Sequence, residues 1–243
     1  MRTAASRLAA LAAAALMMVG GVAAAQDPAH PNLMGIWKVT RPVTAAKTID
    51  GRIPPLLPPA RAVYAKHLAM AAKGDRSFDG VSDCLPPGMP HIQLIAKPIE
   101  ILQKPTAIFF NYQENRLPRR VYLNEQHPAD WDVSYLGDSV GHWDDDTLVV
   151  DTTTMNDRSV LDPSGLPHSD KLHVVERFRL TKAGRLENRI TVDDPKTYAR
   201  PWTMVVRYDR MPAGYRLQEE VCRAGALESE APPPLAAKGK PGH

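Results

Sequence analysis

The sequence predicts an all-β protein, an antiparallel up-and-down barrel, with a β-sandwich as the alternative. From about Ile92 onwards, apolar and polar residues alternate with a period of two along a succession of short segments, which is the pattern of half-buried strands. Hairpin-like links such as Asp144-Asp145-Asp146 join several of them. The 23 Pro and 15 Gly residues of the 243-residue chain disfavour a helical bundle. Without helices between the strands, a parallel sheet of strand-helix-strand units is excluded.

The elements follow in order along the chain. Alternation around Trp37 predicts a first strand over residues 33–40. After a proline-rich connection, residues 60–73 read as the one helix, with Pro58 and Pro59 at its start, Val63, His67, Leu68 and Ala71 on one face, and Gly74 at its end. The later strands are expected at residues 91–96, 100–103, 106–113, 119–124, 139–143, 147–153, 171–181, 185–193, 202–209 and 215–222.

The N-terminus has the pattern of a signal peptide. Arg2 and Arg7 precede an apolar run that is too short for a membrane span, and small residues predict cleavage after Ala25. A retained membrane anchor is the alternative. We therefore expect a signal peptide over 1–25, a periplasmic or secreted single β domain over 26–222 with no membrane span after cleavage, and a flexible tail over 223–243. Cleavage leaves 28 basic against 27 acidic side chains, so the composition gives no reason to expect nucleic acid as a partner.

Two cysteines, Cys84 and Cys222, lie in the part expected to be exported. In an oxidising compartment an even pair favours a disulfide, which here would join residues 138 positions apart. A catalytic or metal-bound cysteine is the alternative, but the chain has no CxxC spacing.

Two resemblances add to this interpretation. The segment Gly35-Ile36-Trp37 resembles the opening of lipocalin-like (calycin) barrels, in which the Trp plugs the closed end. A longer pattern resembles a group of bacterial exported proteins of unknown function, which implies export and no catalytic assignment. That pattern comprises DCLPPGMP from Asp83, GHWDDDTLVVDT from Gly141, NDR from Asn156, PHSD from Pro167, VERF from Val175, DDP from Asp193 and RPW from Arg200.

Two carboxylates occupy unusual strand positions. Glu176 shares a face with Val174 and Phe178, so it needs either a partner or an altered protonation state. It is therefore a candidate general base, or else one half of a structural pair with an arginine on the neighbouring strand. Asp151 ends an apolar run and either lines a cavity mouth or satisfies backbone donors in a tight connection.

Histidines supply the matching proton donors. His142 and His168 lie beside turn residues and are the candidates to return a proton that Glu176 or Asp151 removes. The chain has no HxH or HExxH spacing, so we predict neither a metal site nor a cofactor. Hydrogen-bonded structural histidines are the alternative.

The leading hypothesis is a barrel that binds a small hydrophobic or aromatic molecule in its cup. The alternative is a cofactor-independent lyase, hydratase or isomerase that uses the carboxylates and histidines above. A third possibility is a structural or envelope-interaction protein. The candidate ligand-binding residues are Trp143, Tyr112, Trp131, Trp202, Arg177 and His127.

Overall fold

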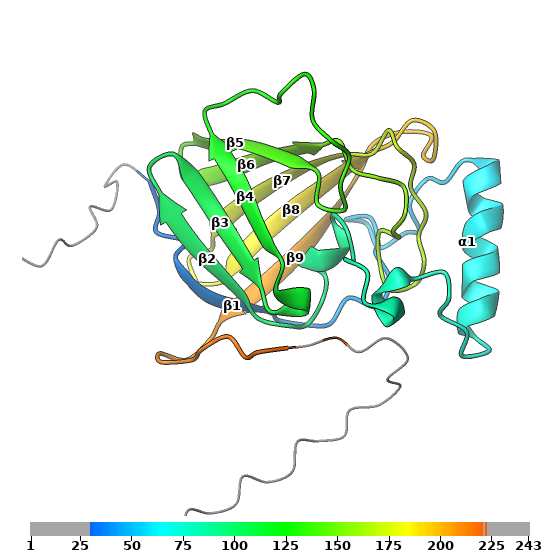
Figure 1. Cartoon of the computed structure of the whole chain (residues 1–243), viewed down its shortest axis with the longest axis horizontal. Coiled ribbons are helices and arrows are strands. Elements are labelled where there is room, and N and C mark those ends of the chain that lie inside the picture. Colours follow the sequence, from blue (N-terminus) through cyan, green and yellow to red (C-terminus); the bar gives the residue numbers. More distant parts are fainter. Residues whose placement is uncertain (1–29, 221, 223–243) are drawn as a thin grey trace, which may run out of the picture.

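The computed structural model describes residues 30–220 and residue 222. In this part of the chain, nine strands form one closed barrel, in which each strand pairs with the next and β9 pairs with β1 (Figure 1). The strands are β1 (Gly35–Val39), β2 (Ile99–Lys104), β3 (Ala107–Tyr112), β4 (Pro118–Leu123), β5 (Asp138–Asp144), β6 (Thr147–Thr153), β7 (His173–Leu180), β8 (Leu186–Asp193) and β9 (Trp202–Arg210). The predicted all-β barrel is confirmed, and closure excludes the sandwich. The predicted signal peptide and C-terminal tail lie outside the described residues.

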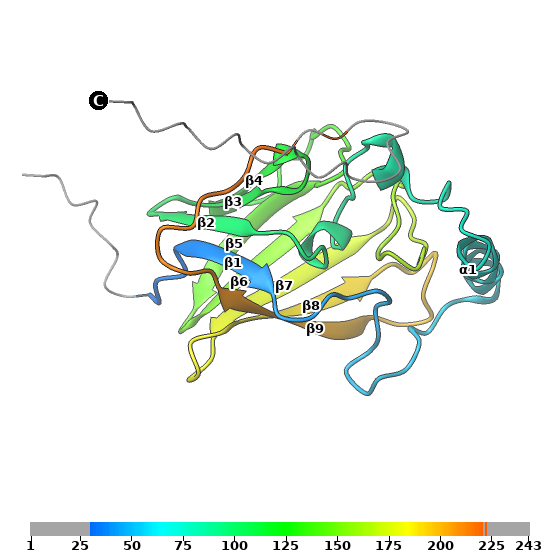
Figure 2. The same ribbon diagram turned by 90° about the horizontal axis from the view of Figure 1, so that it is seen from below.

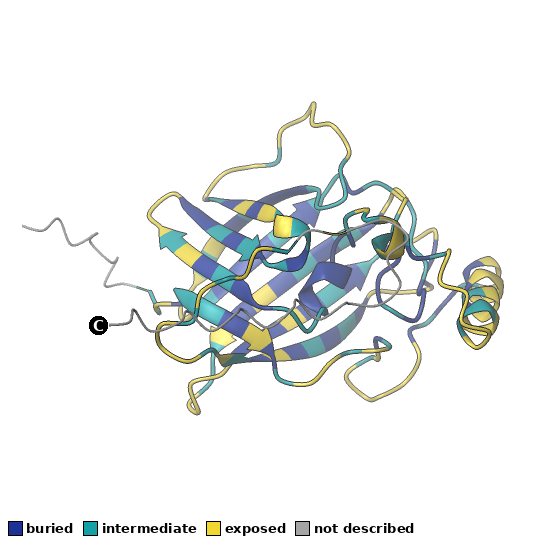
Figure 3. Ribbon diagram, turned by 60° about the horizontal axis from the view of Figure 1, so that its bottom comes forward, coloured by how far each residue is buried: buried dark blue, intermediate teal, exposed yellow. Residues whose placement is uncertain are grey.

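Alternation along the strands separates the barrel interior from its outer face, as Figure 3 shows by burial. On β7 the side chains of Val174, Glu176 and Phe178 are buried, while Arg177 is exposed. The same alternation recurs on β9, because successive side chains of a strand point to opposite faces. The core of the protein is therefore the filled interior of the barrel.

One pair of strands departs from the predicted antiparallel meander. β4 and β5 are parallel and pair only at Tyr122 with Val140 and at Leu123 with Gly141. Parallel neighbours need a crossover in place of a tight hairpin, and residues 124–137, the seam connection, provide it. The sheet is therefore closed only weakly at the β4–β5 seam.

Two predicted strands are wrong. Residues 91–96 instead begin with the short 3-10 helix η2 (His91–Gln93), whose three residues are all buried. This helix therefore plugs the barrel and has no solvent-facing side, unlike a half-buried strand. Residues 215–220 form no strand, because β9 already pairs with β1 and leaves no free edge there (Figure 2). Side-chain contacts such as that of Arg116 with Glu219 tether this segment.

The helix α1 (Pro58–Ala71) begins at the predicted prolines and stands apart at one end of the barrel (Figure 1). Its buried residues are Ala60 and Tyr64, whereas Val63 and Leu68 of the predicted apolar face are exposed. Two further short 3-10 helices are η1 (Gly80–Asp83) and η3 (Glu114–Arg116).

The disulfide predicted between Cys84 and Cys222 is present, with Cα atoms 5.6 Å apart. It joins the segment before η2 to the chain that follows β9. Among the described residues, no helix is long and apolar enough to cross a membrane.

Candidate functional site

The barrel interior is filled by large side chains and by a buried polar network. Trp37, Phe110 and Phe178 are buried inside the barrel, and the Tyr112 hydroxyl accepts a hydrogen bond of 2.9 Å from Gln93 of η2. Burial raises the pKa of Tyr112 above its ordinary value. Side chains therefore occupy the part of the interior in which the sequence predicts a cup, and Tyr112 belongs to this packing.

Glu176 lies at the centre of the network, fully buried inside the barrel as its strand position predicts. Its Oε1 atom accepts hydrogen bonds of 2.9 Å from the side-chain amides of Gln93 and Asn188. Its Oε2 atom lies 2.5 Å from Nη2 of Arg119, which comes from β4 across the interior and not from a neighbouring strand. The carboxylate thus serves here as an acceptor and as the counter-charge of an arginine.

Arg119 connects this network to the β4–β5 seam. Its guanidinium donates from Nε to Ser139 Oγ at 3.0 Å and from Nη2 to Thr152 Oγ1 at 2.8 Å. Burial alone would lower the pKa of Arg119, but the charge of Glu176 raises it above its ordinary value. The remaining nitrogen, Nη1, is buried without a hydrogen-bond partner among the described residues.

Arg119 and Ser139 also line a cleft of about 710 Å³ at the seam, which we call the seam cleft. It lies beyond the short β4–β5 ladder, where the two strands no longer pair, and between the beginning of β4 and the seam connection. The rest of its lining consists of Pro86, Leu117, Pro118, Arg120, Tyr122, Asp130, Trp131, Asp132, Val133, Ser134, Tyr135, Leu136, Gly137 and Asp138.

The wall of the seam cleft combines exposed apolar groups with charge. Trp131 is 46% exposed and Val133 is 64% exposed, so two apolar side chains close together in the sequence are available to a ligand. Arg120 lies over the Tyr122 ring, with its Cζ atom 4.3 Å from the centroid. Of the predicted ligand-binding residues, Trp131 is the one that lines this cleft.

A chain of acids and histidines fastens the seam connection to the outer face of the barrel. His127 contacts Asp138 at 2.6 Å through Nδ1 and Asp151 at 3.0 Å through Nε2, and His173 Nε2 lies 2.9 Å from Asp151. Burial alone would raise the pKa of Asp151, but the hydrogen bonds from His173 and His127 lower it. The same hydrogen bond to Asp151 raises the pKa of His173.

The four predicted catalytic residues do not meet at one site. Glu176 lies inside the barrel, Asp151 lies on its outer face, and His142 is exposed on the outer face of β5. His168 lies in the loop before β7, where Nε2 is 3.0 Å from Ser159 Oγ and Nδ1 is 3.1 Å from the Ser169 carbonyl oxygen. Burial lowers the pKa of His168.

Three other predicted ligand residues lie elsewhere. Trp143 stacks on His30 with ring centroids 4.8 Å apart, and Arg177 pairs with Asp144 at 2.6 Å on the surface. Trp202 lines a separate hollow beside β9. Within the described residues, no group of three or more His, Cys, Asp or Glu side chains is arranged to hold a metal ion.

Arg119 is not among the predicted site residues, although the sequence contains a signal for it. Arg119 alternates with Val121 and Leu123 on β4, which is the same pattern of one charge on an apolar face that marks Glu176. Pairing these two inward charges would have predicted the buried ion pair. Arg120 and Tyr122 give no such signal, because outward strand positions are usually polar.

The protein is therefore a closed barrel with a filled interior and an aromatic-lined cleft on its side, at the β4–β5 seam. No protein-family model matches the chain, and no curated protein matches it.

Proposed function

We propose that this protein is an exported barrel that binds a small aromatic molecule in the seam cleft. The observation that carries the proposal is the cleft itself, which has a volume of about 710 Å³ and is lined by a partly exposed tryptophan, Trp131. Clefts of roughly 300 to 1,000 Å³ with apolar walls and a few placed polar groups are typical of small-molecule sites. Trp131 would cover one face of the ligand.

Export is supported by two independent features. Residues 1–25 have the composition of a signal peptide, and the disulfide between Cys84 and Cys222 suits an oxidising compartment. The resemblance to bacterial exported proteins agrees with both.

The charges of the cleft favour an uncharged ligand. The charge of Arg119 is already balanced by Glu176 at 2.5 Å, so Arg119 adds no net positive field to the cleft. Asp130 and Asp132 also line the cleft and outnumber Arg120, so that together they would repel an anion. A ligand with a phenolic hydroxyl or a ketone therefore suits the cleft better than a carboxylate.

Calorimetric titration of the full chain tests this proposal with two probes that share one ring system, 2-naphthol and 2-naphthoate. We expect saturable binding of 2-naphthol and an affinity at least about tenfold lower for 2-naphthoate. Val133→Ser removes an exposed apolar group from the cleft and should weaken the binding of 2-naphthol. Val63→Ser on α1, another exposed valine, is the matched control and should leave binding unchanged. Equal affinities for both probes, or equal effects of both variants, would contradict the proposal.

A further inference from the structure

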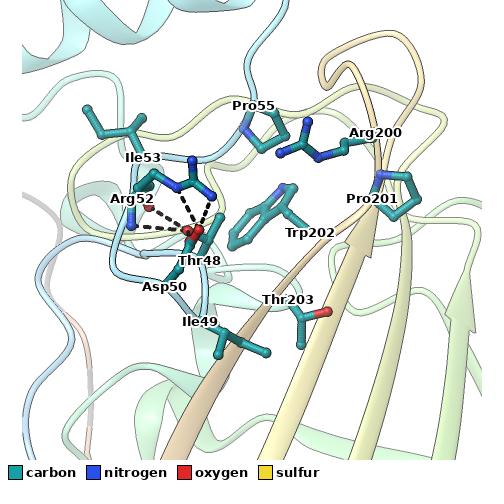
Figure 4. A pocket seen from close by; sticks show the side chains of 10 residues that line it. All are labelled: Thr48, Ile49, Asp50, Arg52, Ile53, Pro55, Arg200, Pro201, Trp202 and Thr203. Carbon is teal, nitrogen blue, oxygen red and sulfur yellow. Dashed lines mark hydrogen bonds and ion pairs between the residues drawn. The ribbon is translucent and has the colours of Figure 1, made fainter.

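A second hollow lies beside β9, on the outside of the barrel and apart from the seam cleft. It has a volume of about 390 Å³ and lies between the loop of residues 48–55 and the start of β9 (Figure 4). We call it the β9 hollow. Its lining residues are Thr48, Ile49, Asp50, Arg52, Ile53, Pro55, Arg200, Pro201, Trp202 and Thr203.

Backbone hydrogen bonds hold both walls of the β9 hollow in place. The amide of Ile49 donates to the Thr203 carbonyl at 3.0 Å, and the amide of Ala199 donates to the Pro55 carbonyl at 2.9 Å. Within the loop, the Thr48 amide donates to the Arg52 carbonyl at 2.9 Å. The hollow is therefore a fixed part of the fold, because its loop is hydrogen-bonded to the residues around the start of β9 on both sides.

Trp202 forms the centre of the β9 hollow, with Arg200 and Pro201 on one side and the Asp50–Arg52 turn on the other (Figure 4). The side chain is only 4% exposed, and its ring packs against Tyr198 with centroids 5.6 Å apart. Its Nε1–H is buried and has no acceptor among the described residues. Buried indole N–H groups normally donate a hydrogen bond, so this atom marks a position for an acceptor.

The charge of the lining indicates which acceptor fits. Asp50 is bound by Arg52, whose Nε donates to it at 2.5 Å, and by the Thr48 hydroxyl. These two hydrogen bonds, that from Arg52 first, lower the pKa of Asp50 to about 2, so the acid stays ionised and paired. Arg200 is in no ion pair with another described residue. The lining therefore carries one uncompensated positive charge, which favours an anion.

The rim of the β9 hollow is apolar. Ile49 and Ile53 are 59% and 57% exposed, and Pro55 and Pro201 complete the apolar part of the lining. A ligand with an apolar body would cover these side chains while its charged end faced Arg200.

We propose that the β9 hollow binds small carboxylates with a short apolar chain. The carboxylate accepts a hydrogen bond from Trp202 Nε1 and pairs with Arg200, while its chain lies against Ile49 and Ile53. This site is independent of the seam cleft, and the two prefer ligands of different charge.

The test follows the indole N–H resonances of the ¹⁵N-labelled full chain during titration with hexanoate. Four tryptophans give four such resonances, and Trp202→Phe identifies one of them while keeping an aromatic ring in place. We expect hexanoate to shift the Trp202 resonance saturably and to leave that of Trp131 in the seam cleft unmoved. Arg200→Gln should weaken this binding about tenfold, and Lys196→Gln, which removes another surface charge, should not.

Hexanol is the control ligand, because it has the same chain without the charge. No shift of the Trp202 resonance with hexanoate, an equal shift with hexanol, or unchanged affinity in Arg200→Gln would each overturn the inference. Failure of 2-naphthol to bind at Trp131 would instead affect only the proposal for the seam cleft, since the two sites report through different indoles.

Discussion

Arg119 and Glu176 meet inside the barrel, where Nη2 of the arginine lies 2.5 Å from Oε2 of the glutamate. Both side chains are almost completely buried, and they come from β4 and β7, which are not neighbours in the sheet. The pair therefore crosses the interior and connects opposite walls. Through Ser139 the same arginine reaches the edge of the seam cleft, so the filled core and the proposed binding site share one residue.

Breaking this pair should strongly destabilise the protein. In Glu176→Gln, Arg119 would remain buried without its counter-charge, and we expect a loss of roughly 3 to 5 kcal/mol in the free energy of unfolding. Urea denaturation measures this loss. The double variant Arg119→Met, Glu176→Leu removes both charges and should be more stable than Glu176→Gln alone. A change below about 1 kcal/mol in Glu176→Gln would show that the pair does not carry the structural role assigned to it.

The contributions of two histidines to the stability of the protein should depend on pH in opposite directions. The hydrogen bond to Asp151 raises the pKa of His173 above its ordinary value of 6.5, whereas burial lowers that of His168 below 6.5. The stability contributed by His173 is therefore fully present below the unfolded value and is lost as the pH rises through its folded pKa. His168 costs stability as the pH falls below 6.5, because the unfolded chain then binds a proton that the folded protein does not.

Unfolding measured at about pH 5.5 and about pH 8.5 separates the two effects. The penalty of His173→Gln should be larger at the lower pH, and that of His168→Gln should be larger at the higher pH. Penalties that change in the same direction for both variants would contradict the assigned contacts.

Gly35 is expected to tolerate alanine poorly. Its φ angle is +133°, and a Cβ atom built there would lie 2.2 Å from Nη1 of Arg210, the arginine whose Cζ lies 4.2 Å from the centroid of the Trp37 ring. Gly184 also has a positive φ angle, but no atom of the described residues lies within 4 Å of its Cβ position. Gly35→Ala should therefore lower the melting temperature clearly more than Gly184→Ala, since only the first displaces Arg210 from Trp37. Equal effects would mean that the close approach of Arg210 is unimportant.

The disulfide should stabilise the chain because it closes a loop with a sequence separation of 138. The chain-entropy model gives a contribution of up to roughly 4 to 5 kcal/mol for such a loop. Thermal unfolding of the Cys84→Ser, Cys222→Ser double variant, compared with the wild-type protein with and without reductant, measures it. We expect the double variant and the reduced protein to melt at the same lower temperature, and an unchanged melting temperature would contradict the expectation.

Local patterns predicted much of this fold, because alternation is a property of each strand by itself. The range 147–153 is correct to the residue as β6, and the inward position of Glu176 followed from the period of two. The parallel pairing of β4 with β5 could not be predicted in this way, since it depends on where the seam connection crosses the barrel. For the same reason the sequence predicted Trp131 as a candidate ligand residue but could not bring it together with Arg119.

The same limit explains the mistaken strand at 91–96. Its residues are apolar enough for a strand, but they fill the barrel as a plug, with Gln93 bonded to Glu176 and Tyr112. A segment that is buried on every side shows no alternation, and sequence periodicity cannot distinguish it from a buried strand.

The indole spectrum of the ¹⁵N-labelled full chain, recorded while 2-naphthol is added, tests the central claim most directly. If the seam cleft is the binding site, the resonance of Trp131 shifts saturably, and those of Trp37 and Trp202 stay in place. Trp131→Phe identifies the resonance, and Val133→Ser should weaken the binding that it reports. Saturable binding that moves the Trp37 or Trp202 resonance and leaves Trp131 unmoved would contradict the account and place the ligand elsewhere on the barrel.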